Sequence, residues 1–177
     1  MALLTKPDIK EATYVETLSY DYPEANVTCL GDGSDYDQLR VTNMELPSKA
    51  ELSARRDYWT RVRVWMAIKA ERDARQANGV LVNGHWMHSD VSSRVQQLGL
   101  VMFGASLPPI SWKCLGGEFI TMTPAFAQAI FQSSAASDVA IFTVAETHKA
   151  RMMASANPLT YDFSTGWPAT YTGSLLL

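Results

Sequence analysis

Residues 80–90 constrain the fold more than any other part of this 177-residue chain. Asn83-Gly84 separates two short β-prone runs. A type I′ turn needs φ above zero at both central residues, which Asn tolerates and Gly adopts freely. The sequence therefore predicts a β-hairpin here. Ser89-Asp90 then offers the capping side chains that begin a helix, so the hairpin fixes how the preceding segment folds back on the next one.

That preceding segment is predicted to be a long helix over residues 48–78. Ser48 with Glu51 forms a capping box, and Gly79 supplies the left-handed stop after a run without Gly or Pro. Apolar and aromatic side chains recur along it and need a cover, either from the C-terminal half or from another copy. We expect a protein–protein interface made by this face and by two aromatic residues of the tail: Trp59, Val62, Trp65, Met66, Trp167 and Tyr171.

The rest of the C-terminal half alternates between helix and hairpin. A shorter helix is predicted from residue 91 to about 106, a second hairpin over 110–122, and a last helix from Thr123-Pro124 to about 156. Asn157-Pro158 ends that helix. Residues 159–177 have no helical period, and their aromatic side chains favour an extended strap over the domain.

Residues 1–47 read as irregular and partly β. Three β-prone runs at 13–15, 27–30 and 39–41 are separated by Pro and Gly, which is typical of either a small sheet or an extended arm. The predicted organisation is an N-terminal arm or small β segment (1–47) and a helical domain with two hairpins and the strap (48–177). The predicted fold class is α+β, mainly α.

Charge is distributed unevenly along the chain. Residues 1–48 carry −6, residues 49–78 carry +4 and the remainder −1. Such an asymmetry can orient one copy against another or against a partner, or it can form two solvated faces of one domain. The basic residues of 49–78 spread around the helix among acidic ones, and the pI is about 5.6, so no nucleic-acid partner is expected.

The sequence also indicates the cellular compartment of the protein. The N-terminal residues lack the apolar core of a signal peptide, and no apolar run approaches the ~20 residues of a membrane-spanning helix. We therefore expect no membrane partner, and either a cytoplasmic protein or a component of a particle assembled in the cytoplasm. Cys29 and Cys114 are the two cysteines; a disulfide and two free thiols are both compatible with them, and a reducing cytoplasm favours free thiols.

No pattern in the sequence predicts reaction chemistry. His85 and His88 are three residues apart on an expected strand, so they face opposite sides and do not readily share a metal. The acidic stretch at 32–37 lacks the final glutamate of a calcium loop. Phosphate loops, dinucleotide fingerprints and nucleophile elbows do not occur. We expect neither an enzyme nor a cofactor or metal.

An ordered series of short motifs resembles a known family. The series runs through Glu71-Arg72-Asp73-Ala74, Asn83-Gly84-His85-Trp86, Ser93-Arg94-Val95-Gln96, Trp112-Lys113, Thr121-Met122-Thr123-Pro124 and Ala145-Glu146-Thr147-His148. Over about residues 60–168, the chain is similar to the C-terminal domain of unknown function found in many tailed-bacteriophage proteins, often ones encoded beside tail fibres.

The resemblance implies where the protein acts, but it implies no chemical reaction. It implies a structural protein of the phage virion, in the tail or tail-fibre region, that is assembled in the host cytoplasm. Such a protein attaches or stabilises fibres through contacts with other tail or fibre proteins and as a homo-oligomer. A tail-fibre assembly chaperone that leaves the particle is the alternative. The resemblance transfers no catalytic residue.

Overall fold

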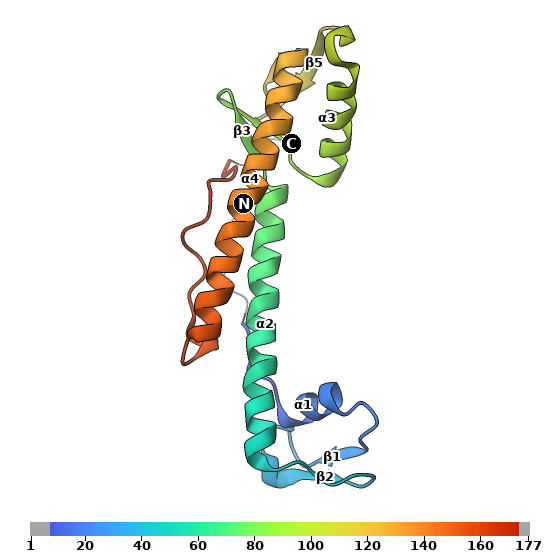
Figure 1. Ribbon diagram of the computed structural model, residues 1–177, viewed down its shortest axis with the longest axis vertical. Helices are drawn as coiled ribbons and strands as arrows, with labels where there is room; N and C mark the ends of the chain where they lie inside the picture. Colours follow the sequence, from blue (N-terminus) through green and yellow to red (C-terminus); the bar gives the residue numbers. More distant parts are fainter. Residues whose placement is uncertain (1–7, 174–177) are drawn as a thin grey trace. The chain divides into compact units, whose positions relative to one another are not determined.

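The structure, a computed structural model, describes residues 8–173. These residues form four α-helices and three two-stranded antiparallel sheets (Figure 1). The fold is therefore α+β and mainly α, as the sequence predicts.

Packing divides the described residues into two compact units. The hairpin unit comprises residues 68–148 and 163–173, and the N-terminal unit comprises residues 8–67 and 149–162. The long helices α2 (Lys49–Ala77) and α4 (Pro124–Ala154) contribute residues to both. Packing thus groups residues 8–47 with the first part of α2. The division at residue 47 stays a prediction about the organisation of the chain.

The N-terminal unit begins with a helix that the sequence analysis did not predict. Residues 13–15 are not a β-prone run but the start of α1 (Tyr14–Asp21). Thr13 accepts a hydrogen bond from the Glu16 amide at 3.1 Å, and the Glu16 carboxylate accepts one from the Thr13 amide at 2.7 Å. This capping box satisfies two amides that a helix start leaves unpaired, and it outweighs the β propensity of Thr, Tyr and Val.

The other two β-prone runs of this segment do form strands, as predicted. Strands β1 (Val27–Cys29) and β2 (Leu39–Val41) pair antiparallel, with the short 3₁₀ helix η1 (Tyr36–Gln38) before β2. Figure 1 shows α1 and this sheet beside the first turns of α2. Four buried side chains, from α1, β2 and α2, form their shared core: Tyr14, Leu18, Leu39 and Leu52.

Helix α2 has the ends that the sequence predicts. The Ser48 amide donates to the Glu51 carboxylate at 2.9 Å, and the Ser48 hydroxyl accepts from the Glu51 amide at 3.3 Å. At the other end Gly79 has φ +87°, a left-handed conformation that ends the helix at little cost for glycine. Its amide donates to the Ser89 hydroxyl at 2.8 Å, which ties the end of α2 to the residues before α3 (Val91–Phe103).

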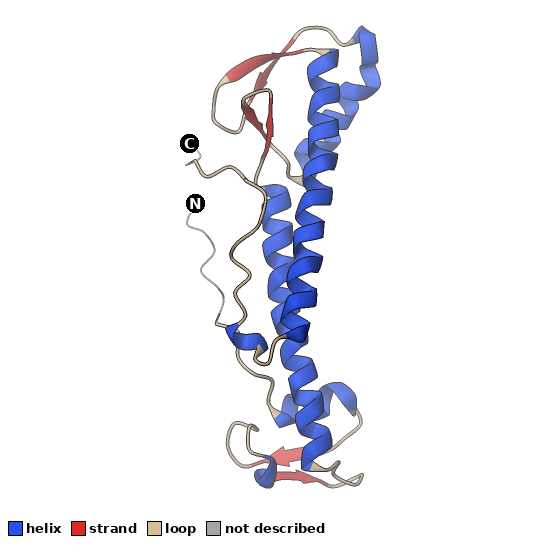
Figure 2. Cartoon of the chain, turned by 60° about the vertical axis from the view of Figure 1, so that its left-hand side comes forward, coloured by secondary structure: helices blue, strands red, loops and turns tan. Residues whose placement is uncertain are grey.

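Two hairpins follow in the hairpin unit (Figure 2). Strands β3 (Val80–Val82) and β4 (His85–Met87) pair around Asn83 and Gly84, whose φ values of +50° and +84° confirm the predicted type I′ geometry. Strands β5 (Ile110–Lys113) and β6 (Phe119–Met122) form the second hairpin. The Leu115 amide donates to the Trp86 carbonyl at 2.8 Å, so the two hairpins are hydrogen-bonded to each other.

Helices α3 and α4 complete this unit. Asp90 caps α3 as predicted, and its carboxylate accepts from the Ser93 amide at 3.0 Å. A 3₁₀ turn, η2 (Gly104–Ser106), follows α3. The core of the unit lies between the hairpins and the first turns of α4, and its least exposed members are Met87, Cys114, Met122, Ala127 and Ile130.

The chain after α4 is extended, apart from η3 (Pro158–Thr160). In the hairpin unit, the amide of Tyr171 donates to the Asn78 carbonyl at 2.9 Å, and the Asn78 side chain donates to the Tyr171 carbonyl at 2.9 Å. Residues 163–173 therefore lie against the end of α2. The predicted strap and arm also include residues 174–177 and 1–7, which lie outside the described residues. Within residues 8–173, we find no helix with the length and apolar character needed to cross a membrane.

Candidate interaction surface

Helix α3 carries an apolar stripe on its outer side. Four apolar residues lie at spacings of four, three and four positions, so they share one face of the helix. Their exposed fractions are Val91 80%, Val95 66%, Leu98 44% and Met102 81%. We call these four residues the α3 stripe. Soluble proteins rarely leave a contiguous apolar strip like this uncovered, and such strips mark sites where another chain binds.

The opposite side of α3 holds the helix in place. Leu100 is buried in the core of the unit, and Gln97, also buried, donates to the His88 carbonyl at 2.7 Å. Leu100 and Gln97 thus hold α3 in place within the chain. The stripe is a second apolar face of α3, which these contacts leave exposed.

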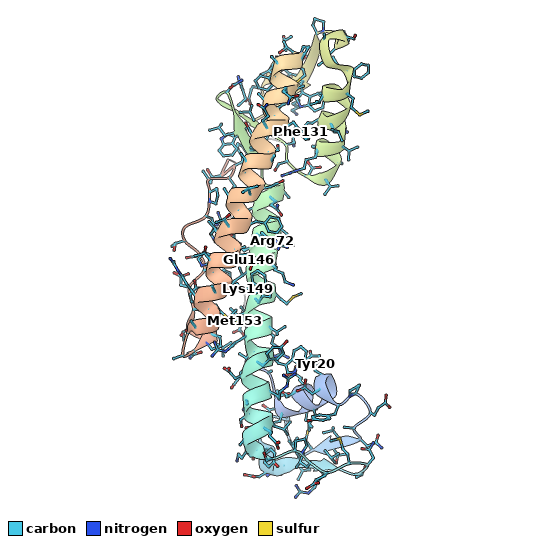
Figure 3. All side chains as sticks on the ribbon, in the orientation of Figure 1. Tyr20, Arg72, Phe131, Glu146, Lys149 and Met153 are labelled. Carbon is cyan, nitrogen blue, oxygen red and sulfur yellow. The ribbon has the colours of Figure 1, made fainter. Side chains whose placement is uncertain are left out.

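A groove runs between α3 and α4, and three residues of the stripe, Val91, Val95 and Leu98, line its α3 side. Phe131 of α4, labelled in Figure 3, lies on its wall and is about half exposed. The wall also includes Ser134, whose buried hydroxyl has no hydrogen-bond partner among the described residues. A buried hydroxyl without a partner costs roughly 1–3 kcal/mol. A bound segment that offers this hydroxyl a hydrogen bond would remove that cost.

The polar end of the groove is rigidly held. Arg94 donates to the Asp138 carboxylate at 2.9 Å, to the Gln76 carbonyl at 3.2 Å and to the Ser89 carbonyl. Asp138 also accepts from the Gln76 side chain at 3.3 Å. These contacts fix the spacing of α3 and α4 and tie both to the end of α2. The groove is therefore preformed, which lowers the entropic cost of binding.

The structure places the predicted interface residues of α2 largely within their own unit. Trp59 is half-buried: its ring centroid lies 4.5 Å from that of Tyr20, which is labelled in Figure 3, and its indole N–H donates to Asp21 at 3.0 Å. Val62 and Trp65 are half-buried as well, and the Lys149 ammonium lies 4.7 Å from the Trp65 ring centroid. Met66, at 55%, is the most exposed residue of this group.

The predicted interface residues of the tail also have contacts within the chain. Trp167 donates to the Phe163 carbonyl at 2.7 Å, and its ring packs against His148 and Arg75. Tyr171 packs against the Trp86 ring. The six predicted residues therefore fall into two groups, one in each unit, and their role as an interface stays a prediction.

Sequence reasoning missed the α3 stripe for a physical reason. Apolar periodicity shows that Leu98 and Met102 share a face, but it does not show whether that face is turned inward. Here the buried face of α3 includes a glutamine, while valines and a methionine lie in solvent. Only the positions of α4 and the hairpins reveal the difference.

Many of the opposite charges of residues 1–48 and of α2 form ion pairs with each other inside the N-terminal unit. Acidic residues of the first segment pair with basic residues of α2 in three close contacts of 2.6–2.7 Å: Asp21 with Arg55, Glu11 with Arg56, and Glu16 with Arg63. Hydrogen bonds from Arg55 hold the pKa of Asp21 below its ordinary value. These charges attach the first segment to α2.

The two cysteines are free thiols, Cys29 half-buried and Cys114 buried. Of the three histidines, His148 is buried and its Nε2 lies 2.9 Å from the Thr165 carbonyl oxygen. His85 has a more unusual neighbourhood, because its Nδ1 lies 3.2 Å from a Glu118 carboxylate oxygen on the other hairpin.

Comparison with known proteins places the hairpin unit in a wider group. Residues 60–165, more than half of the chain, match the family described as Domain of unknown function (DUF4376). The matched segment contains both hairpins, α3 and all of α4. No curated protein and no solved structure matches the chain.

Proposed function

The chain belongs to the family of the domain of unknown function DUF4376, and we propose that it is a structural protein of a bacteriophage virion. It acts in the tail or tail-fibre region, where it attaches or stabilises fibres by protein–protein contacts. The phage context rests on the resemblance of the motifs between residues 60 and 168. The mode of action rests on the α3 stripe, which is the observation that carries the proposal.

The stripe and groove define the partner's chemistry. The four-three-four spacing is the spacing with which one helix packs along another. We infer that the partner is a helix of a tail or fibre protein, with an apolar face for Val95 and Leu98. We expect this partner helix also to carry a polar group that hydrogen-bonds to the Ser134 hydroxyl. This mode of action needs no catalysis by the chain.

Mass spectrometry of purified particles tests the location. The proposal expects the protein at a fixed ratio to the other tail proteins after washing in high salt. Its absence from particles, despite expression in the infected cell, would refute the virion role. That outcome would favour a fibre-assembly chaperone, which acts before the particle is complete.

A pair of matched substitutions tests the surface. Val95→Glu places a charge within the stripe, whereas Val139→Glu changes an equally exposed valine of α4 that lies outside the groove, 68% against 66% exposed. We expect Val95→Glu to lower incorporation into particles at least tenfold, as expected when a central apolar contact of more than about 1.4 kcal/mol is lost. Val139→Glu should leave incorporation unchanged, and equal effects of the two would reject the stripe as the contact surface.

The predicted homo-oligomer has a separate test. Sedimentation of the purified protein measures its mass in solution, and Val95→Glu and Met66→Glu address the stripe and the exposed part of the α2 face. A monomer at all concentrations would leave the heterologous partner as the only occupant of these surfaces.

A further inference from the structure

Three side chains with metal-binding atoms converge where the two hairpins meet. His85 begins β4, while Cys114 and Glu118 flank the turn between β5 and β6. Their ligand atoms (an imidazole nitrogen, Sγ and a carboxylate oxygen) all lie within 4.8 Å of one another. Imidazole, thiolate and carboxylate are the three donor types that bind Zn²⁺ in proteins.

The backbone holds these three positions together. The Leu115 amide donates to the Trp86 carbonyl at 2.8 Å, which joins the strand of His85 to the turn after Cys114. Across that turn, the Cys114 amide donates to the Glu118 carbonyl at 2.8 Å. Gly116 leaves room for the carboxylate, because a Cβ at this position would lie 2.5 Å from Glu118 Oε2. The hairpin framework therefore holds the backbone positions of the three residues close together.

The distances suit a tetrahedral zinc ion after a small adjustment. Bonds of about 2.0–2.3 Å to zinc place neighbouring ligand atoms roughly 3.3–3.8 Å apart. His85 Nδ1 and Glu118 Oε1 are already 3.2 Å apart. Side-chain rotation alone can close the remaining separation, since His85 and Glu118 are partly exposed and free to adjust.

The cluster is open to solvent on one side and buried on the other. The partly exposed imidazole and carboxylate give an ion access from solvent, and the buried sulfur lies on the inner side of the site.

We propose that His85, Cys114 and Glu118 form a Zn²⁺ site that clamps the β3–β4 hairpin to the β5–β6 hairpin. Three protein ligands leave the fourth position of the tetrahedron open to water or to a side chain of a bound partner. Because the site lies within one compact unit, it stands apart from the proposed phage role and is tested independently of it.

The test uses the purified full chain, freed of metal with a chelator and titrated with Co²⁺ as a spectroscopic probe and then with Zn²⁺. A tetrahedral site with one thiolate gives a cobalt–sulfur charge-transfer band and visible bands, which Zn²⁺ displaces at one ion per chain. We expect zinc to raise the thermal midpoint as well, because it binds only the folded site. Absence of the charge-transfer band and of any thermal shift at micromolar zinc would overturn the proposal.

Matched variants identify the ligands. Cys114→Ser should abolish the charge-transfer band. His85→Gln and Glu118→Gln, both at partly exposed positions, should weaken binding at least tenfold, since even loss of an outer-shell partner costs about 10- to 100-fold. Cys29→Ser and His88→Gln are the controls and should bind as the original chain does. Retained affinity in both His85→Gln and Glu118→Gln, or loss of binding in Cys29→Ser, would overturn the assignment.

Discussion

Removal of the Asp21 carboxylate should loosen α1 from α2. Asp21 is the last residue of α1, and its side chain is only 11% exposed. It accepts two hydrogen bonds from Arg55 at 2.6 Å and one from the Trp59 indole at 3.0 Å. These three bonds form one of the polar links between α1 and α2, beside the ion pair of Glu16 with Arg63.

The size of the effect follows from the indole bond. The Arg55 side chain is 46% exposed, and ion pairs near solvent add little to stability, so we assign its bonds no part of the estimate. A hydrogen bond to a charged acceptor contributes about 1.5–3 kcal/mol, and the half-buried indole places this one near the lower end. We expect Asp21→Ala to lower the free energy of unfolding by about 2 kcal/mol. Asp21→Asn should lower it by about half as much, because the amide oxygen still accepts a neutral bond.

Urea unfolding followed by tryptophan fluorescence measures these values. Trp59→Phe removes the indole donor but keeps the ring against Tyr20, so a double-mutant cycle with Asp21→Ala, which removes the acceptor, isolates the bond. Asp37→Asn serves as the control, since its contact with Lys49 is exposed and should be worth less than about 0.5 kcal/mol. A coupling energy near zero between Asp21 and Trp59 would refute the reasoning.

The pH dependence has a definite sign. Because Arg55 and Trp59 hold the pKa of Asp21 below its ordinary value in the folded state, this contribution is complete above the unfolded pKa, near 3.9. It is lost as the pH falls through the folded pKa. The stability difference between the original chain and Asp21→Asn should therefore shrink in acid and stay constant at neutral pH. A difference that grows in acid would contradict the assignment.

Three further substitutions test the ends of the helices by chemical denaturation. Asp90→Ala removes the cap of α3 and should cost about 0.5–2 kcal/mol; an unchanged midpoint would reject the cap. Gly79→Ala should cost at least about 1 kcal/mol, because φ is +87° and the new Cβ would lie 2.6 Å from Leu115 Cδ2. Arg61→Met removes a guanidinium that donates to the carbonyls of Met152, Met153 and Ser155 at 3.0–3.1 Å, and should cost about 1–3 kcal/mol; a smaller loss than in Arg61→Lys would contradict that role.

Local chemistry in the sequence determined most of the secondary structure. The caps and turns act through contacts within a few residues, so the sequence alone predicts them. Examples are Ser48 with Glu51, Asn83 with Gly84, and Asp90. The same rule applied to Thr13 and Glu16 predicts α1. The error there came from weighing β propensity above a capping box of the same form as the one at Ser48.

Only the tertiary structure decided which surfaces are free and which groups meet. Periodicity places Trp59 on an apolar face, but Tyr20 and Asp21 come to it from another part of the chain. Spacing separates His85 from Cys114, yet pairing of the two hairpins brings them together. In each case the deciding contact joins residues far apart in sequence, and no local pattern encodes such a contact because it depends on how the elements pack.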